Sequence, residues 1–330
     1  MCSVFPNKNL RSFSLSSFFA GLRRSRGRRR SRDGFILISV LLLGVIFISC
    51  ATAFAWFTRL QIKSALREKI SLENRSMARV LTGAIISGLK SNTLTNYDSP
   101  RLAWFKPFLF PADNLGLWAV QITPLDDRIP VRNLFLPDGN TLRNELRKTW
   151  EDLWVKLGKR EMIYATLDFL DRDKKPRMGG AEKDHYINRQ VLDLSEFLLI
   201  ETMTPALLYG EGSGKERKPG LADYCTLWSG GKINLNVAPR EVLAILPGLD
   251  DSMAQKIVDY REETSLKGTS DLRNVPGLPP KSVTALMNLA DFKSRYFSIQ
   301  IELLEETGGG TNFNVVIDKT AGKVVRWEEI

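Results

Sequence analysis

The sequence predicts an α+β fold, with a long N-terminal helix, a small antiparallel sheet and a large helical domain inserted into that sheet. An uncharged apolar run at 35–57, continued by an amphipathic pattern at 58–90, indicates the helix. Three short strand-like segments near the end of the chain, "RYFSIQIEL", "TNFNVVID" and "KVVRWEEI", indicate the sheet. A mostly helical pattern that contains an internal repeat separates these parts and indicates the insertion.

The positive charge of the chain is concentrated at its start. The formal net charge is +10, but residues 1–34 hold nine Lys or Arg against one acid, which leaves a net charge of only +2 on residues 35–330. A nearly neutral body argues against a nucleic-acid-binding protein, which needs a cationic surface. The cysteines Cys2, Cys50 and Cys225 lie in three different settings, so neither a disulfide framework nor a cysteine metal site is expected.

The segment 35–57 can cross a bilayer. It holds 23 residues without a charge or a proline, about 35 Å as a helix against a hydrocarbon core of roughly 30 Å. Seven arginines lie in the twelve residues before it, which predicts a cytoplasmic N-terminus and a body on the far side. Three interpretations are open: a signal peptide cleaved after the small residues of 53–55, a plain anchor, or a helix that begins at a cleavage point after Gly34.

The third interpretation resembles the type IV prepilin leader, a basic segment that ends in glycine and is followed by phenylalanine and about twenty apolar residues. The resemblance implies that a membrane peptidase cuts after Gly34 and methylates the amine of Phe35, while the helix remains as anchor and filament core. The fifth mature residue is usually glutamate in that family and is Ser39 here. Because that carboxylate pairs with the amine of a neighbouring subunit, its loss suits a subunit at the filament tip.

Helix is expected to continue beyond the bilayer to about residue 90. Apolar residues recur there at helical spacing, at Leu66, Ile70, Met77, Leu81, Ile85 and Leu89. We predict that this stripe is the face on which the soluble domain rests.

The middle of the chain is expected to be a connection followed by mixed elements. Residues 91–116 are rich in Pro, Asn and Asp and are interpreted as the connection. The helix at 141–158 should begin at a cap on Thr141 and bury Leu142, Leu146, Trp150 and Leu153. The other expected elements are a strand at 117–123, an extended segment at 129–137, helices at 162–173 and 192–200, a loop at 210–220 and a strand at 230–236.

An internal repeat follows, "LPGLDDSMAQKIVDYR" from Leu246 and "VPGLPPKSVTALMNL" from Val275. Each copy has Pro-Gly between apolar residues and then a helical pattern, which is typical of a helix-hairpin-helix-like (SAM-like) repeat. Such hairpins often bind DNA, but residues 239–293 carry seven Lys or Arg and eight Asp or Glu. Without a cationic surface, packing between protein segments is the preferred interpretation.

The stretch "DFLDRDKKPRMGGAEKDHY" at 168–186 clusters carboxylates of the kind that Ca²⁺ prefers. It is no EF-hand, because Lys175 and Pro176 stand where an oxygen ligand and a glycine are required; solvated or helix-capping acids are the alternative. The lone histidine, His185, has no nucleophile partner in any recognisable motif, so an enzyme is not expected.

The prepilin-like start, the 168–186 stretch, "GGKINLNVAPREVLAILPGLDDSMAQKIVDYRE" and "SRYFSIQIEL" together resemble the minor pseudopilin K of bacterial type II secretion systems. The resemblance implies a cleaved leader at 1–34, a transmembrane helix at 35–57, its continuation at 58–90 and a periplasmic pilin-like domain at 91–330. A helical domain would be inserted at about 134–230, with the hairpins at about 239–292. Calcium binding is also implied, with the ligands carried over onto Asp171, Asp173 and Glu182.

The resemblance further implies a single-pass inner-membrane protein at the tip of the secretion pseudopilus, where it initiates or caps assembly and supports export of folded proteins. Its implied partners are the I and J minor pseudopilins, the major pseudopilin, the prepilin peptidase and the inner-membrane platform. Two alternatives are a membrane-anchored helix-hairpin-helix protein for DNA uptake and a minor pilin of a type IV pilus, which would not predict the large insertion.

Overall fold

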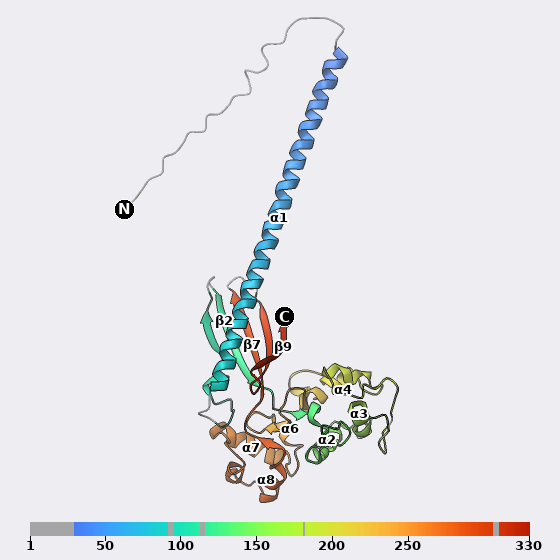
Figure 1. Ribbon diagram of the computed structural model, residues 1–330, viewed down its shortest axis with the longest axis vertical. Helices are drawn as coiled ribbons and strands as arrows, with labels where there is room; N and C mark the ends of the chain where they lie inside the picture. The colour runs from blue at the N-terminus through green and yellow to red at the C-terminus, as the bar shows by residue number, and fades with distance from the viewer. Residues whose placement is uncertain (1–29, 92–95, 113–115, 181, 306–309) are drawn as a thin grey trace, which may run out of the picture. The chain divides into compact units, whose positions relative to one another are not determined.

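The computed structural model describes residues 30–91, 96–112, 116–180, 182–305 and 310–330 (Figure 1). Most of the predicted leader, residues 1–29, lies outside this described part. The chain divides into two compact units, residues 1–72 and 73–330, and each is treated by itself.

Helix α1 (Arg30–Ser91) contributes to both units. It forms because 35–57 and the segment after it contain no proline and are rich in Leu, Ala, Ile, Lys and Arg, most of them strong helix formers. The prediction that helix continues to about residue 90 is confirmed.

Five antiparallel strands form the main sheet of the second unit, in the order β1-β2-β7-β8-β9. Their bounds are β1 Phe108–Pro111, β2 Gly116–Pro124, β7 Tyr296–Glu305, β8 Asn312–Asp318 and β9 Lys323–Glu329. The predicted strand at 117–123 and the three closing strands are confirmed. Strand β1 was not predicted, because four residues ending at a proline on a sheet edge carry too little periodicity to stand out from a connection.

The last part of α1 packs on this sheet, as Figure 1 shows for β2, β7 and β9. The buried positions of the helix are Asn74, Ala78, Thr82, Ile85 and Leu89. The predicted stripe is therefore right at its end but wrong at Met77, which is 39% exposed, because the small Ala78 is the residue that faces the strands. Leu81 is half-buried against the same core, whereas Leu66 and Ile70 of the first unit are exposed.

Residues 125–295 form the insertion between β2 and β7, two neighbouring strands. Its α-helices are α2 Asn144–Lys156, α3 Met162–Leu170, α4 Pro205–Tyr209, α5 Leu221–Tyr224, α6 Arg240–Leu243, α7 Asp251–Glu263 and α8 Pro280–Leu286. Its short parallel strand pairs are β3 Ile129–Pro130 with β4 Cys225–Thr226 and β5 Ile233–Asn234 with β6 Ala290–Asp291. The 3-10 helices are η2 Ala103–Phe105 before the sheet and, in the insertion, η3 Val131–Asn133, η4 Leu194–Leu199, η5 Gly214–Glu216 and η6 Asp271–Asn274.

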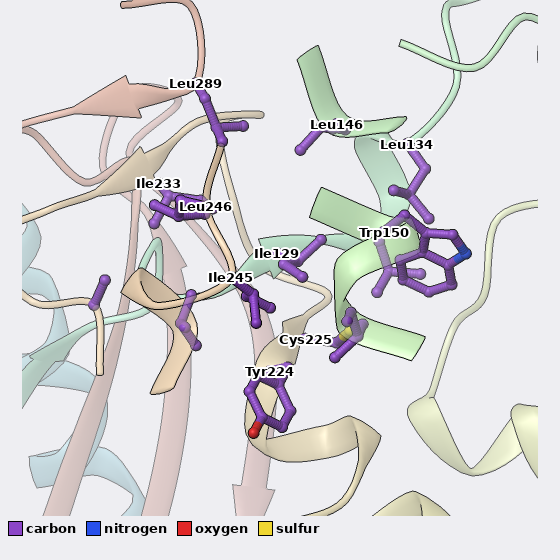
Figure 2. Packing of buried hydrophobic residues seen from close by; sticks show 14 of the residues in the cluster. Ile129, Leu134, Leu146, Trp150, Tyr224, Cys225, Ile233, Ile245, Leu246 and Leu289 are labelled. Atoms are coloured by element: carbon purple, nitrogen blue, oxygen red, sulfur yellow. The ribbon is translucent and has the colours of Figure 1, made fainter. Parts of the chain in front are cut away.

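One apolar core runs through the whole insertion. Figure 2 shows Trp150 of α2 and Ile129 of β3 in the same cluster as Ile245, Leu246 and Leu289 of the hairpin region. Each fully buried large side chain stabilises the fold by about 1.5–3 kcal/mol. The segment before residue 230 and the hairpins after 239 therefore form one packed body.

Both ends of the insertion are fixed to each other through Asp126. Its buried carboxylate accepts hydrogen bonds from the backbone N–H groups of Arg295 at 2.8 Å and Tyr296 at 2.9 Å, and from that of Gly230 at 2.6 Å. Bonds to an ionised acceptor are stronger than neutral ones. The entry strand, the exit strand and the 230 turn are thus held at one point.

Three local expectations need correction. Helix α2 begins at Asn144 without a side-chain cap, and the hydroxyl of Thr141 instead donates to Asp138, which holds 138–141 in a turn. The helix expected at 192–200 is the 3-10 helix η4, capped by Asp193. The strand expected at 230–236 is only the two-residue β5, because it pairs with the equally short β6.

Candidate functional site

The start of α1 presents the predicted processing residues on an exposed helix. Gly34 has open space around it, and the side chain of Phe35 is 72% exposed. The large apolar residues from Phe35 to Phe57 are all exposed, and Gly34–Ser91 is long and apolar enough to cross a membrane. A lipid-exposed helix needs this surface, because hydrocarbon offers no hydrogen bonds.

Several hydroxyl groups on this helix donate hydrogen bonds within it. The hydroxyl of Ser39 donates to the carbonyl of Phe35 at 2.8 Å, and those of Thr52 and Thr58 donate to carbonyls of the preceding turn. Such back-bonding makes a polar side chain compatible with an apolar environment. Ser39 therefore carries no negative charge that could pair with a neighbouring subunit's amine.

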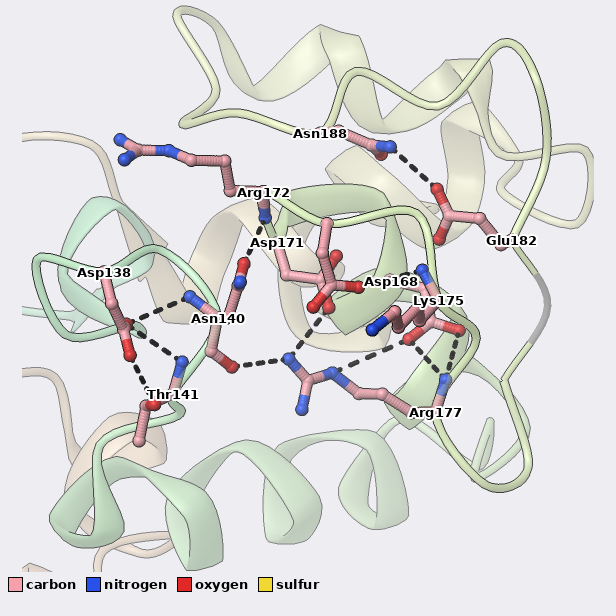
Figure 3. A network of polar contacts seen from close by, with 11 residues as sticks. Asp138, Asn140, Thr141, Asp168, Asp171, Arg172, Lys175, Arg177, Glu182 and Asn188 are labelled. Atoms are coloured by element: carbon pink, nitrogen blue, oxygen red, sulfur yellow. Dashed lines mark hydrogen bonds and ion pairs between the residues drawn. The ribbon is translucent and has the colours of Figure 1, made fainter.

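The second candidate site is the acidic stretch after α3, which folds around Arg177 (Figure 3). The guanidinium of Arg177 donates to Asp171 Oδ2 at 2.8 Å and to the carbonyl of Asn140 at 2.8 Å, and lies 3.6 Å from Asp168 Oδ1. Its backbone N–H also contacts both carboxylate oxygens of Asp168, at 3.1 and 3.2 Å. One cation thus serves two carboxylates that are almost completely buried.

That sharing explains the electrostatics of the pair. Burial, the largest influence, raises the pKa of Asp171 to about 7, with Asp173 and Asp168 adding repulsion and Arg177 acting in the opposite direction. Two buried carboxylates beside one guanidinium leave one negative charge without a partner, so a retained proton is favourable.

Gly180 lets the loop close over Asp168. A Cβ at Gly180 would lie 2.8 Å from Asp168 Cγ and well inside van der Waals contact of its Oδ2. Only glycine fits here without displacing the carboxylate.

The predicted calcium ligands do not converge. Asp171 is bonded to Arg177, Asp173 accepts the N–H of Lys175 at 2.8 Å, and Glu182 Oε1 accepts the side-chain amide of Asn188 at 2.8 Å. Across the described residues, no group of three or more His, Cys, Asp or Glu side chains is placed to hold a metal ion. As arranged here, these three carboxylates do not fit a shared calcium ion.

Some oxygen atoms nevertheless lack partners in this region. Glu182 Oε2, Asn188 Oδ1 and Asp171 Oδ1 are buried without a hydrogen bond. A buried unsatisfied polar atom costs about 1–3 kcal/mol, and oxygen atoms are the donors that hard cations bind. Glu182 and Asn188, which contact each other, are better placed than Asp171 to bind a cation, because the guanidinium of Arg177 already lies beside the Asp171 carboxylate.

The glycine turns of the repeat are packing positions. Gly248 has φ +80° and Gly277 has φ +71°, values that favour glycine. The hydroxyl of Ser282 in α8 donates to the carbonyl of Gly248, so the second hairpin covers the turn of the first. The amine of Lys256 lies over Gly277, where a Cβ would come within 2.7 Å of it.

His185 is exposed and contacts the ring of Tyr186 edge-on, at 5.3 Å between ring centroids.

Sequence reasoning missed Arg177 and Gly180 as the residues that organise the acidic stretch. Both stand inside the quoted motif, and an arginine amid clustered aspartates is a signal for an internal ion pair.

Comparison with known proteins gives one match to a family model and one to a curated protein. The family model of the helix-hairpin-helix motif matches residues 229–289. Type II secretion system protein K of Dickeya chrysanthemi is 24% identical over 151 residues, which cover 42% of this chain and 40% of that protein. The aligned segment therefore spans well under half of this relative.

A solved structure matches over most of the chain. It is the crystal structure of the GspK-GspI-GspJ complex from the type 2 secretion system of enterotoxigenic Escherichia coli, with a TM-score of 0.58 and 13% identity, covering 82% of this chain and 99% of the matched one. At this identity the match establishes the fold alone. The chain is thus similar to type II secretion system protein K in sequence and has the fold found in the GspK-GspI-GspJ complex, as the order of its motifs predicts.

Proposed function

We propose that this chain is a minor pseudopilin at the tip of a type II secretion pseudopilus, where it initiates or caps assembly and supports export of folded proteins. The observation that carries the proposal is the insertion of 125–295 between two neighbouring strands of the sheet that packs on α1. A repeating filament subunit has to fit between copies above and below it, whereas a terminal subunit tolerates a large additional body on its outer side.

The leader and helix fit the same proposal. Cleavage after Gly34 and methylation of Phe35 would leave α1 as the membrane anchor at 35–57 and as the packing helix of the filament, with the body in the periplasm. The hydrogen bond of Ser39 to its own helix supports a terminal place, since this subunit has no carboxylate to pair with the amine of a subunit above it.

The proposed role is mechanical. The filament is assembled from the membrane by the inner-membrane platform, with the major pseudopilin as its shaft and the prepilin peptidase as the processing enzyme. The I and J minor pseudopilins would be the direct partners, and this chain would supply the shaped end without catalysing a reaction. The GspK-GspI-GspJ complex supports this assignment of partners by its fold likeness.

Co-purification tests the proposal. The full chain, tagged at its C-terminus, is co-expressed with the I, J and major pseudopilins of the same system and purified in detergent. We expect I and J to be retained together, and the major pseudopilin to be retained only in their presence. Retention of the major pseudopilin alone would instead indicate a subunit of the shaft.

We further propose that the 168–188 region binds calcium, with Glu182 as the best placed of the predicted ligands. The unpaired Glu182 Oε2 and Asn188 Oδ1 support this, while the ion pair with Arg177 makes Asp171 a poor ligand. Calcium should raise the unfolding temperature of the wild type and of Asp171→Asn, but not that of Glu182→Gln. An equal shift in all three proteins would exclude Glu182, and no shift in any would exclude the site.

A further inference from the structure

A cavity of about 510 Å³ opens in the insertion, between residues 131–143, the end of α3 and residues 189–190. Four arginines line it, Arg132, Arg143, Arg172 and Arg189. The described lining residues include no Asp or Glu, although Glu145 and Glu196 contact Arg143 and Arg189 from outside the lining and Asp138 interacts electrostatically with Arg172. These three carboxylates offset part of the positive charge, and an anion in the cavity relieves the repulsion that remains among the four guanidinium groups.

Two of the arginines are fixed in place. Arg132 Nε donates to the carbonyl of Val191 at 2.9 Å, and its guanidinium lies 4.8 Å from the ring centroid of Trp228. Arg189 makes two contacts with Glu196, at 3.0 and 3.2 Å. These two side chains form fixed walls of the cavity; Arg132 contributes positive potential, whereas the charge of Arg189 is paired with Glu196.

The other two arginines keep capacity for a ligand. The Nε of Arg143 is buried without a hydrogen-bond partner, and its guanidinium has only a long contact with Glu145, at 3.5 Å. The side chain of Arg172 packs over Gly139 and is exposed; within the described part of the chain it makes no hydrogen bond. A guanidinium presents five donors in a planar fork that matches a carboxylate.

The remaining lining decides which anion fits. Phe135, Leu136 and Leu170 line the same cavity and give it an apolar wall. A phosphate ion would leave this wall uncovered, whereas a glutamate side chain brings two methylene groups beneath a carboxylate. The volume accommodates a few side chains and is within the range of specific binding pockets.

We propose that this four-arginine cavity binds glutamate side chains of an acidic segment of a partner protein, with Arg143 and Arg172 as the residues that contact the carboxylates. The inference does not depend on the proposed pseudopilin role.

The test uses the full chain in detergent and a fluorescent, end-blocked peptide with three consecutive glutamates, measured by fluorescence anisotropy. The matched peptide has glutamine at the same three positions, and inorganic phosphate is added as a competitor. The variants are Arg172→Gln, the double variant Arg143→Gln with Arg172→Gln, and the control Arg160→Gln. Arg160 is an exposed arginine of the same insertion that lies outside the cavity lining.

We expect the glutamate peptide to bind the wild type and the glutamine peptide not to bind. Arg172→Gln changes an exposed side chain and should weaken binding measurably, and the double variant should weaken it by at least about tenfold. The control should bind like the wild type. Absence of binding to the wild type, or an equal loss in Arg160→Gln, would refute the site, and displacement by phosphate at a comparable concentration would refute the assignment to a peptide.

Discussion

Replacing Arg177 by methionine tests the organisation of the acidic stretch most severely. The change removes the cation while keeping much of the apolar stem, and it leaves Asp168 and Asp171 buried without their guanidinium. Breaking a buried pair by removing one partner costs about 3–5 kcal/mol. Because the Arg177 side chain is itself 26% exposed, we expect a loss near 3 kcal/mol in the free energy of unfolding.

The cost should depend on pH. With a folded pKa of about 7 against an ordinary value of 3.8, Asp171 retains its proton in the folded chain where the unfolded chain has lost it. Its contribution to stability is therefore fully present below pH 3.8 and is lost as the pH rises through 7. Removing Arg177 takes away the influence that lowers this pKa, so the penalty of Arg177→Met should be larger at alkaline pH than at pH 5.

The penalty of Arg177→Met is measured by denaturant unfolding of the full chain in detergent, followed by circular dichroism at pH 5 and at alkaline pH. Arg160→Met is the control, since that exposed side chain has no ion pair among the described residues; surface changes of this kind stay within about 0.5 kcal/mol. A loss equal to that of the control, or a loss that is the same at both pH values, would refute the role given to Arg177.

Two substitutions test close packing in the second unit. Ala78→Leu introduces a larger side chain where α1 meets the sheet and should cost about 1–3 kcal/mol, whereas the exposed Ser76→Leu should not; equal unfolding midpoints would contradict the burial of this face. Gly180→Ala displaces the carboxylate of Asp168 and should lower the unfolding temperature by several degrees. Gly268→Ala, where the nearest atom to a Cβ is 3.8 Å away, is its control, and similar melting of both variants would show that Asp168 does not hold this loop.

The elements that the sequence predicts well are those with a strong period. Residues 299–304 of β7 alternate between buried and exposed positions, and α2 buries Leu146, Trp150 and Leu153 at helical spacing, so local pattern and tertiary packing agree in these elements. Strand β1 and the start of α2 were not foreseen correctly. An edge strand of four residues is too short to show a periodic pattern of apolar residues. The hydroxyl of Thr141 donates a hydrogen bond to Asp138, so this side chain does not cap the helix.

The acidic stretch shows why a candidate site is harder to predict than a fold. Residue type correctly indicated that 168–184 is rich in oxygen ligands, but it could not show that Arg177 folds back onto Asp168 and Asp171. The four-arginine cavity could not be predicted from the sequence for a related reason. Its arginines are separated by up to 57 positions and come together only in the tertiary structure.

The N-terminus of the mature, membrane-bound protein is the measurement that tests the pseudopilin assignment most directly. The measurement is mass spectrometry of the wild type and of Gly34→Ala. The variant introduces no steric clash, because a Cβ at Gly34 meets nothing within 4 Å. We expect the wild type to begin with methylated Phe35 and the variant to remain unprocessed. A wild-type chain that begins at Met1, or that is cut after Ala55, would contradict the assignment.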